Sequence, residues 1–185
     1  MTATSKKWAA AHLSLRHDWV TPQSLFSELH NEFNFVLDAA ASDHNAKCQH
    51  FLTDALSADW QACAARAALL PSTQMPLLRA LIPPAHAVWL NPPYGRDIYK
   101  WIDKAHQESL RGVCVVVLVF SRTDTKWWHD LAMNAAEIRF IVGRITFVGA
   151  PAPAPAPSCL LVFDQKRRAR LSAPLISSVT LPRKD

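Results

Sequence analysis

The residues best suited to chemistry form the loop Asn91-Pro92-Pro93-Tyr94, which follows the apolar run 88–90. The apolar run predicts a buried strand. Proline has no N–H group to give to a sheet, so the two prolines end the strand and stiffen the turn behind it. We expect a rigid loop that carries one amide side chain and one exposed aromatic ring. It would lie at the carboxyl ends of the strands, where α/β sheets bind ligands.

This loop offers acceptors for an exocyclic amine, whose lone pair is delocalised into its ring. The side-chain oxygen of Asn91 and the main-chain carbonyl of Pro92 could both accept from such an amine and draw charge to its nitrogen. Pro93 helps to hold them rigid. Tyr94 offers a flat face to a base rotated out of a duplex, and such stacking contributes roughly 1–3 kcal/mol per base. We therefore predict Asn91, Pro92, Pro93 and Tyr94 as catalytic residues, with Tyr94 also contacting the base.

A carboxylate marks the end of another predicted strand, at 33–37. Asp38 follows this strand and is itself followed by Ala39, Ala40 and Ala41. Small residues let a ligand approach the backbone closely, so Asp38 is a candidate ligand for a cationic group. The alternative is that Asp38 simply caps the next turn.

The predicted elements place both sites on one sheet. Thr21 reads as a helix N-cap, with Pro22 at the first helical position. The alternation of strands and helices, closed by a long-looped hairpin over 144–163, predicts a doubly wound α/β sheet. That sheet would be mostly parallel, with an antiparallel C-terminal strand. Helices are predicted over 22–31, 60–70, 97–110 and 126–136, and strands over 33–37, 88–90, 113–120, 137–142, 144–148 and 158–163, with a short strand possible at 51–54.

Length and composition indicate one globular domain. The chain has 185 residues, of which 50% are hydrophobic and 19% charged. We expect a flexible lead-in over 1–17, a folded domain over 18–164 and a basic tail over 165–185. No apolar run reaches the roughly 20 residues of a membrane helix, and no secretory leader is visible, so a cytoplasmic protein is expected. The four cysteines and eight histidines show no ligand spacing, and no metal site is predicted.

The net charge of +5 favours a polyanionic partner. Basic residues crowd the predicted tail, where they would be either a solvated surface or an arm that contacts phosphates. Arg122 and Lys126 follow the strand predicted at 113–120, and they too could contact DNA phosphate or simply be solvated. The basic residues of the predicted tail with a possible DNA-binding role are Lys166, Arg167 and Arg168.

The loop matches the (Asp/Asn/Ser)-Pro-Pro-Tyr motif of S-adenosylmethionine-dependent amino-methyltransferases. The wider pattern resembles the phage and prophage DNA N6-adenine methyltransferase family, because several further motifs occur in the family's order. These segments are Trp19-Val20-Thr21-Pro22, Leu37-Asp38-Ala39-Ala40-Ala41, Asp59-Trp60, Asn91 to Gly95, Thr123-Asp124-Thr125 with Trp127-Trp128, and Gly143-Arg144 with Phe147.

The resemblance implies a Rossmann-like methyltransferase sheet, S-adenosyl-L-methionine as cofactor and double-stranded DNA as substrate. Asp38 would lie near the methionine amino group, Asp54 near the ribose hydroxyls and Asp59 near the adenine amino group. For Asp54 and Asp59 the alternative is a cap or a solvated loop acid. The implied cofactor-binding residues are Thr21, Pro22, Asp38, Ala39, Ala40, Asp54, Asp59 and Asn91, and the implied DNA-binding residues are Tyr94, Arg122, Lys126, Arg144, Lys166, Arg167 and Arg168.

Two other functions fit the same residues. Asn-Pro-Pro-Tyr also serves planar amides, so a methyltransferase acting on protein glutamine or on RNA is one alternative. A non-catalytic DNA-binding module is the other, although such a module would not need Asp38 and Asn91 together. The basic balance and the family pattern favour DNA adenine.

Overall fold

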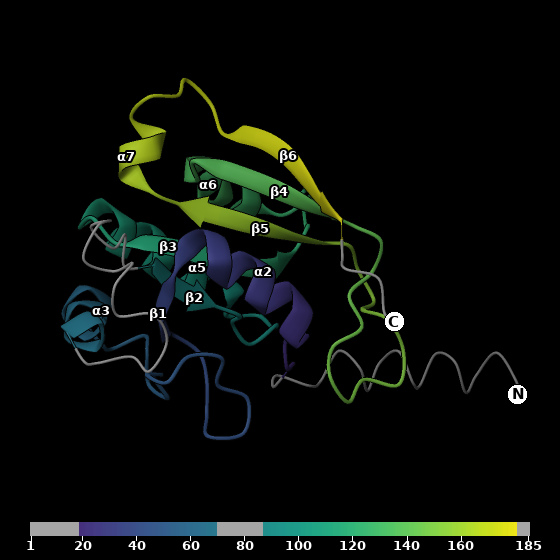
Figure 1. Ribbon diagram of the computed structural model, residues 1–185. Coiled ribbons are helices and arrows are strands. Elements are labelled where there is room, and N and C mark those ends of the chain that lie inside the picture. Colours follow the sequence, from purple (N-terminus) through teal and green to yellow (C-terminus); the bar gives the residue numbers. More distant parts are fainter. Residues whose placement is uncertain (1–18, 70–86, 181–185) are drawn as a thin grey trace, which may run out of the picture.

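A computed structural model describes residues 19–69 and 87–180 (Figure 1). Six strands form one sheet in the order β1-β2-β3-β5-β4-β6. The strands are β1 (Phe35–Asp38), β2 (Ala87–Leu90), β3 (Cys114–Phe120), β4 (Glu137–Val142), β5 (Ser158–Phe163) and β6 (Leu175–Thr180). The helices are α2 (Gln23–Phe33), α3 (Trp60–Leu69), α5 (Ile98–Leu110), α6 (Lys126–Asp130) and α7 (Gln165–Arg168), with a 3-10 turn η1 (Ala132–Asn134).

The strand directions confirm a mostly parallel α/β sheet. β1, β2 and β3 run parallel to one another, β5 is antiparallel to both β3 and β4, and β4 and β6 are parallel. Among the six strands of the described ranges, β5 alone therefore runs against the rest. The β-branched sequence of β3 suits its central place, because side chains on both of its faces are buried.

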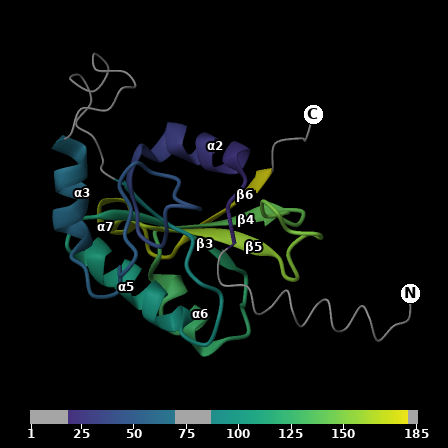
Figure 2. The ribbon, with the colours of Figure 1, turned by 90° about the horizontal axis from the view of Figure 1, so that it is seen from below.

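Helices cover the sheet on both faces (Figure 2). On one face, Phe26 of α2 packs against the rings of Phe35 and Trp89. On the other face, Ile102 of α5 and Trp128 of α6 join the alternate side chains of the strands, together with α3. Strand side chains point alternately to the two faces, so the sheet divides the core into two clusters.

Three expectations for the secondary structure need correction. Residues 144–148 are not a strand, and β4 is the partner of β5 in the hairpin. Ile145 and Phe147 are fully buried from within the connecting loop, which produces an alternating pattern although the segment makes only an isolated bridge, from Val148 to Val20. The segment 51–54 contributes only an isolated bridge from Phe51 to Asp38. The helix predicted over 126–136 ends at Asp130 and continues only as η1.

The predicted basic tail is also different in the structure. Residues 165–180 form α7 and β6, and β6 pairs with β4 along its whole length. The Ser177 hydroxyl also donates to Glu137 Oε1 of β4 at 2.9 Å. The alternating, partly β-branched sequence 175–180 follows the basic residues and completes the sheet, so residue 165 does not end the folded domain. The predicted lead-in at 1–17 lies outside the described residues.

No helix within the described ranges has the length and apolar character needed to cross a membrane.

Candidate active site

The carboxyl ends of β1 and β2 bring together residues that are distant in the sequence. Asp38 lies opposite Trp89 in the parallel pair, and the Ala39 N–H donates to the Trp89 carbonyl at 2.8 Å. Asn91 follows two residues after Trp89. Neighbouring parallel strands have their carboxyl ends at the same edge of a sheet. Asp38 is therefore adjacent to the loop Asn91-Pro92-Pro93-Tyr94, which we call the acceptor loop.

The Asn91 amide is held at both of its polar atoms. Nδ2 donates to the Trp19 carbonyl at 2.5 Å, and Oδ1 accepts from the Tyr94 hydroxyl at 3.0 Å. A carbonyl can only accept, which fixes the NH₂ group of Asn91 toward Trp19. The amide oxygen still has a second lone pair. Within the described parts of the chain, no group donates to the Pro92 carbonyl.

Tyr94 does not present an exposed ring, contrary to expectation. Its side chain is 9% exposed, and its ring stacks on Phe120 with 4.3 Å between centroids. The hydroxyl lies 3.2 Å from the Leu118 carbonyl in addition to its contact with Asn91. Burial raises the pKa of the Tyr94 phenol well above its usual range. The ring belongs to the core cluster on the α2 face because the loop turns back over the end of β3.

Asp38 is almost completely buried, at 2% exposure. Its carboxylate accepts from the Lys47 N–H at 2.9 Å and from the Ala40 N–H at 3.2 Å. Burial raises the pKa of Asp38 to about 6, although these two backbone hydrogen bonds oppose the rise. The carboxylate therefore does order the following turn, as the capping alternative proposed. Each oxygen retains a lone pair for a further donor.

Thr21 is not the N-cap of α2. Pro22 takes that position, and no side-chain hydrogen bond caps the helix. Thr21 is 1% exposed, and its hydroxyl has no hydrogen-bond partner within the described residues. A buried hydroxyl without a partner is uncommon in proteins and costs free energy. Thr21 lies between Trp19, which holds Asn91, and the first turn of α2.

The two remaining acids predicted to bind the cofactor lie in different places. Asp54 is exposed, and its carboxylate accepts from the Ser57 hydroxyl at 2.7 Å. Asp59 accepts from the Ala62 N–H at 2.9 Å and pairs with Arg111 at 2.6 Å, a hydrogen bond that lowers the pKa of Asp59. Arg111 lies just before the start of β3. The structure therefore places Asp59 toward the amino ends of the strands and does not bring it to Asp38 and Asn91.

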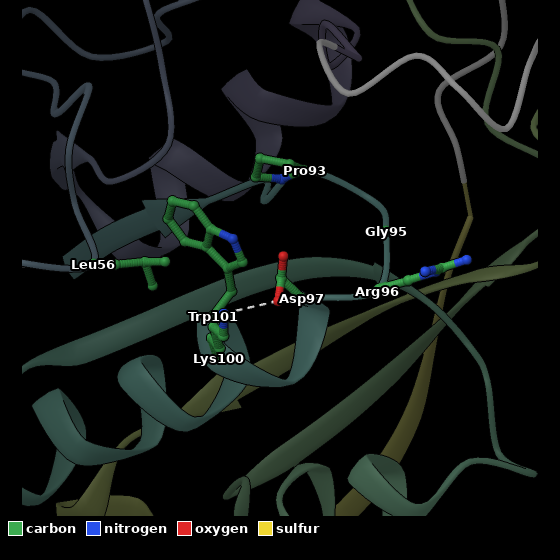
Figure 3. Close-up of a pocket in the computed structure, with 7 residues that line it drawn as sticks. All are labelled: Leu56, Pro93, Gly95, Arg96, Asp97, Lys100 and Trp101. Atoms are coloured by element: carbon green, nitrogen blue, oxygen red, sulfur yellow. Dashed lines mark ion pairs between the residues drawn. The ribbon is translucent and has the colours of Figure 1, made fainter.

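A cavity of about 280 Å³ lies beside the acceptor loop (Figure 3). Trp101 and Leu56 lie on the same side of it, below Pro93, and Arg96 points away (Figure 3). Sequence reasoning missed these residues as site residues. One available signal was that Arg96 lies two residues after Tyr94, and another was that Trp101 lies in the first turn of the helix that follows. The lining residues are Leu56, Pro93, Gly95, Arg96, Asp97, Lys100 and Trp101.

The predicted DNA-binding residues fall into two groups. Arg122 and Arg144 are exposed and follow the carboxyl ends of β3 and β4. Arg144 also closes its own loop by donating to the Ala154 carbonyl at 2.9 Å. Lys126, at the start of α6, is exposed and pairs with Asp130. All three therefore come from segments that follow the carboxyl edge, where Asn91 lies.

The second group, Lys166, Arg167 and Arg168, lies on α7. This helix follows β5 (Figure 1), which runs antiparallel to β3, so α7 lies at the opposite edge of the sheet from the carboxyl end of β2, which precedes Asn91. Arg167 is bonded to Asp164 at 3.3 Å and stacks over Phe33 at 5.3 Å. The structure does not bring these three residues to the acceptor loop.

Metal ligation has no candidate in residues 19–69 and 87–180, where no group of three or more His, Cys, Asp or Glu could hold an ion.

An α/β sheet that presents an Asn-Pro-Pro-Tyr loop beside a buried strand-end carboxylate has the features of an amino-methyltransferase.

Comparisons with known proteins give the family. Residues 9–173 match the family model for DNA N-6-adenine-methyltransferase (Dam). The chain therefore belongs to this family, as its sequence motifs predicted. It is 28% identical over 159 residues to the DNA N-6-adenine-methyltransferase of Haemophilus phage HP1, covering 80% of this chain and 79% of that protein. It is also 28% identical over 135 residues to the enzyme of the same name from Escherichia phage T1, covering 72% of this chain and 48% of that protein.

One solved structure is also similar, that of protein Atu636 from Agrobacterium tumefaciens, described as a predicted O-methyltransferase. It shares 16% identity and a TM-score of 0.35, over 93% of this chain and 85% of that chain.

Proposed function

We propose that this DNA adenine methyltransferase transfers a methyl group from S-adenosyl-L-methionine to the exocyclic amine of an adenine rotated out of double-stranded DNA. Family membership supports the reaction and the substrate class. The observation that carries the assignment of the site is the position of Asn91. Its oriented amide lies at the carboxyl end of β2, beside the Asp38 carboxylate at the end of β1.

Asn91 and Pro92 act on the acceptor amine. The second lone pair of Asn91 Oδ1 and the main-chain carbonyl of Pro92 accept the two N–H groups, so negative charge moves toward the amine nitrogen as the new bond forms. The hydrogen bond from Asn91 Nδ2 to Trp19 sets the orientation of the amide before substrate arrives. Neighbouring prolines limit backbone movement, which lowers the reorganisation needed in the transition state.

The residues near Asp38 fit the cofactor. Bound S-adenosyl-L-methionine supplies an electrophilic methyl group on a sulfonium. Asp38 accepts a hydrogen bond from the cofactor's amino group, and that cation favours the ionised carboxylate. The buried Thr21 hydroxyl, which has no partner within the described residues, donates to the cofactor's carboxylate. Ala39 and Ala40 beside Asp38 have small side chains, although the Ala39 N–H is bonded to the Trp89 carbonyl and the Ala40 N–H to Asp38.

The cavity beside Pro93 fits the adenosine part of the cofactor. The indole of Trp101 and the side chain of Leu56 supply apolar contact area for a purine. Asp54 lies two residues before Leu56, is exposed, and is the candidate acceptor for the ribose hydroxyls. Asp59 has no part in this proposal, because its carboxylate caps α3 and pairs with Arg111.

The test measures transfer of tritiated methyl groups from S-adenosyl-L-methionine to unmethylated duplex DNA, to RNA and to a protein fraction in parallel. We expect incorporation into duplex DNA, recovered as N6-methyladenine after enzymatic digestion. Incorporation only into RNA or protein would overturn the choice of substrate. If DNA bound without any methyl transfer or cofactor binding by calorimetry, the protein would be a binding module.

A further inference from the structure

We propose that Tyr94 fills the place of the target base while the enzyme is free of DNA, and that the incoming adenine displaces it from Phe120. This inference rests on the proposed function, because it concerns the acceptor side of the same site. Phe120 is then a further residue that contacts the base. Tyr94 acts as a gate in the free enzyme and as a stacking surface once the base has bound.

Tyr94 makes the contacts that a bound adenine needs. Its ring stacks on Phe120 with 4.3 Å between centroids and 23° between planes. Its hydroxyl lies 3.0 Å from Asn91 Oδ1, the acceptor assigned to the amine. The Tyr94 side chain therefore has a flat ring on Phe120 and a donor directed at Asn91, as a bound adenine would have.

The Tyr94 hydroxyl has one proton and two acceptors within reach, since the Leu118 carbonyl lies 3.2 Å away. While that proton points to Asn91, it occupies one lone pair of the amide oxygen. Two adjacent aromatic rings, Phe120 and Phe147, also fill the space around the phenol. The base and the Tyr94 ring cannot both stack on the same face of Phe120, so binding of one displaces the other.

The movement is a side-chain rotation. Pro92 and Pro93 hold the backbone before Tyr94, and a rotation about χ1 carries the ring out of the core without bending the loop. The displaced ring can then cover the other face of the base. Burial of the hydroxyl between Asn91 and Leu118 sets the free-energy cost of this rotation.

A labelling experiment can follow Tyr94 directly, because the chain contains only two tyrosines. The other, Tyr99, is 49% exposed on α5 and lies outside the proposed site. Incorporation of 3-fluorotyrosine into Y99F gives one fluorine resonance from Tyr94. We expect that resonance to lack a solvent isotope shift in the free protein. It should move on addition of S-adenosylhomocysteine and unmethylated duplex DNA, and not with S-adenosylhomocysteine alone.

A resonance that does not move with DNA, in a Y99F protein that still methylates DNA, would overturn the gate while leaving the proposed function intact. Absence of DNA methylation by the wild-type enzyme would instead overturn the proposed function. The two failures are therefore distinguishable.

Removing the hydroxyl gives a second, independent test. Y94F keeps the ring but loses the hydrogen bonds that hold it inside, so we expect duplex DNA to bind roughly two- to tenfold more tightly. Y99F is the matched control and should bind as wild type. Equal or weaker binding by Y94F, measured by fluorescence anisotropy, would contradict the gate and favour a purely supporting role for the hydroxyl.

Discussion

At the scale of single residues, the site depends on how one amide is oriented. A rotation of the Asn91 side chain exchanges the positions of its NH₂ group and its oxygen. The first can only donate a hydrogen bond and the second can only accept one. The Trp19 carbonyl decides the orientation because it can only accept a hydrogen bond. A backbone atom on a segment that is distant in sequence thus prepares Asn91 for its proposed role.

Asn91→Ala removes the acceptor and should lower kcat about 10²- to 10³-fold, the usual effect of losing one transition-state hydrogen-bond partner. The affinity for the cofactor should change little, because Asp38 and the cavity beside Pro93 remain. Tritiated methyl transfer gives kcat, and calorimetry gives the affinity for S-adenosyl-L-methionine. Wild-type kcat in the variant would remove Asn91 from the mechanism.

The raised pKa of Asp38 predicts that the free energy of unfolding depends on pH. Its pKa rises from 3.8 in the unfolded chain to about 6 in the fold, so the folded protein holds the proton more tightly. The resulting stabilisation is complete below pH 4 and is lost as the pH rises through 6, a change of about 3 kcal/mol. Asp38→Asn lacks this ionisation.

We therefore expect the stability of D38N relative to wild type to increase between pH 4 and pH 7, as measured by urea denaturation at each pH. The variant should also lose cofactor affinity at pH 7, because a neutral amide replaces the partner of the amino group. A difference in unfolding free energy that does not vary with pH would contradict a raised pKa for Asp38.

At the scale of elements, α7 and β6 convert the predicted tail into part of the sheet. Asp164 begins α7 by accepting from the Lys166 and Arg167 N–H groups at 2.9 and 3.2 Å. β6 then covers the open edge of β4. Arg139 on β4 is bonded to Glu32 of α2 and to Glu137, which joins this end of the sheet to the helix layer.

Truncation after residue 164 should therefore destabilise the fold, beyond any effect on DNA affinity. It exposes the N–H and C=O groups of β4 that pair with β6, which invites aggregation. We expect a lower thermal midpoint or insoluble protein, measured by circular dichroism and sedimentation. A truncated protein with the wild-type midpoint would show that β6 contributes nothing to stability.

At the scale of the whole molecule, the direction of β5 separates two basic surfaces. Arg96 and Arg122 are exposed at the carboxyl edge beside the proposed site, and neither pairs with an acid within the described residues. Lys166 and Arg168 lie on α7 at the other edge, separated by the length of β5, roughly 20 Å for its six residues. We therefore expect the first surface, and not the second, to contact the DNA whose base reaches Asn91.

Neutralising the two surfaces should therefore have different effects on DNA binding. R96Q/R122Q should weaken duplex binding and reduce the slope of log K against log salt by about two, because each phosphate contact contributes about 0.9. K166Q/R168Q changes the net charge equally and should leave the slope unchanged. Equal slopes for the two variants across a salt titration would place the DNA elsewhere.

The sequence by itself determined the parts whose signals are local. Prolines stop a strand wherever it lies, so the loop at Asn91 was predictable, as was the carboxylate that follows an apolar strand at Asp38. Periodicity also predicted α5 and β3 to within one residue of their bounds. Family motifs then gave the reaction, because they depend on the order of residues along the chain.

Only the tertiary structure decided which way side chains face and which distant segments meet. It placed the ring of Tyr94 in the core, because Phe120 on another strand offers a stacking surface. It gave Asp59 a partner in Arg111, and it placed α7 at the far edge, because β5 runs antiparallel. Such outcomes depend on strand direction and on packing between segments far apart in sequence, which no local pattern of residues specifies.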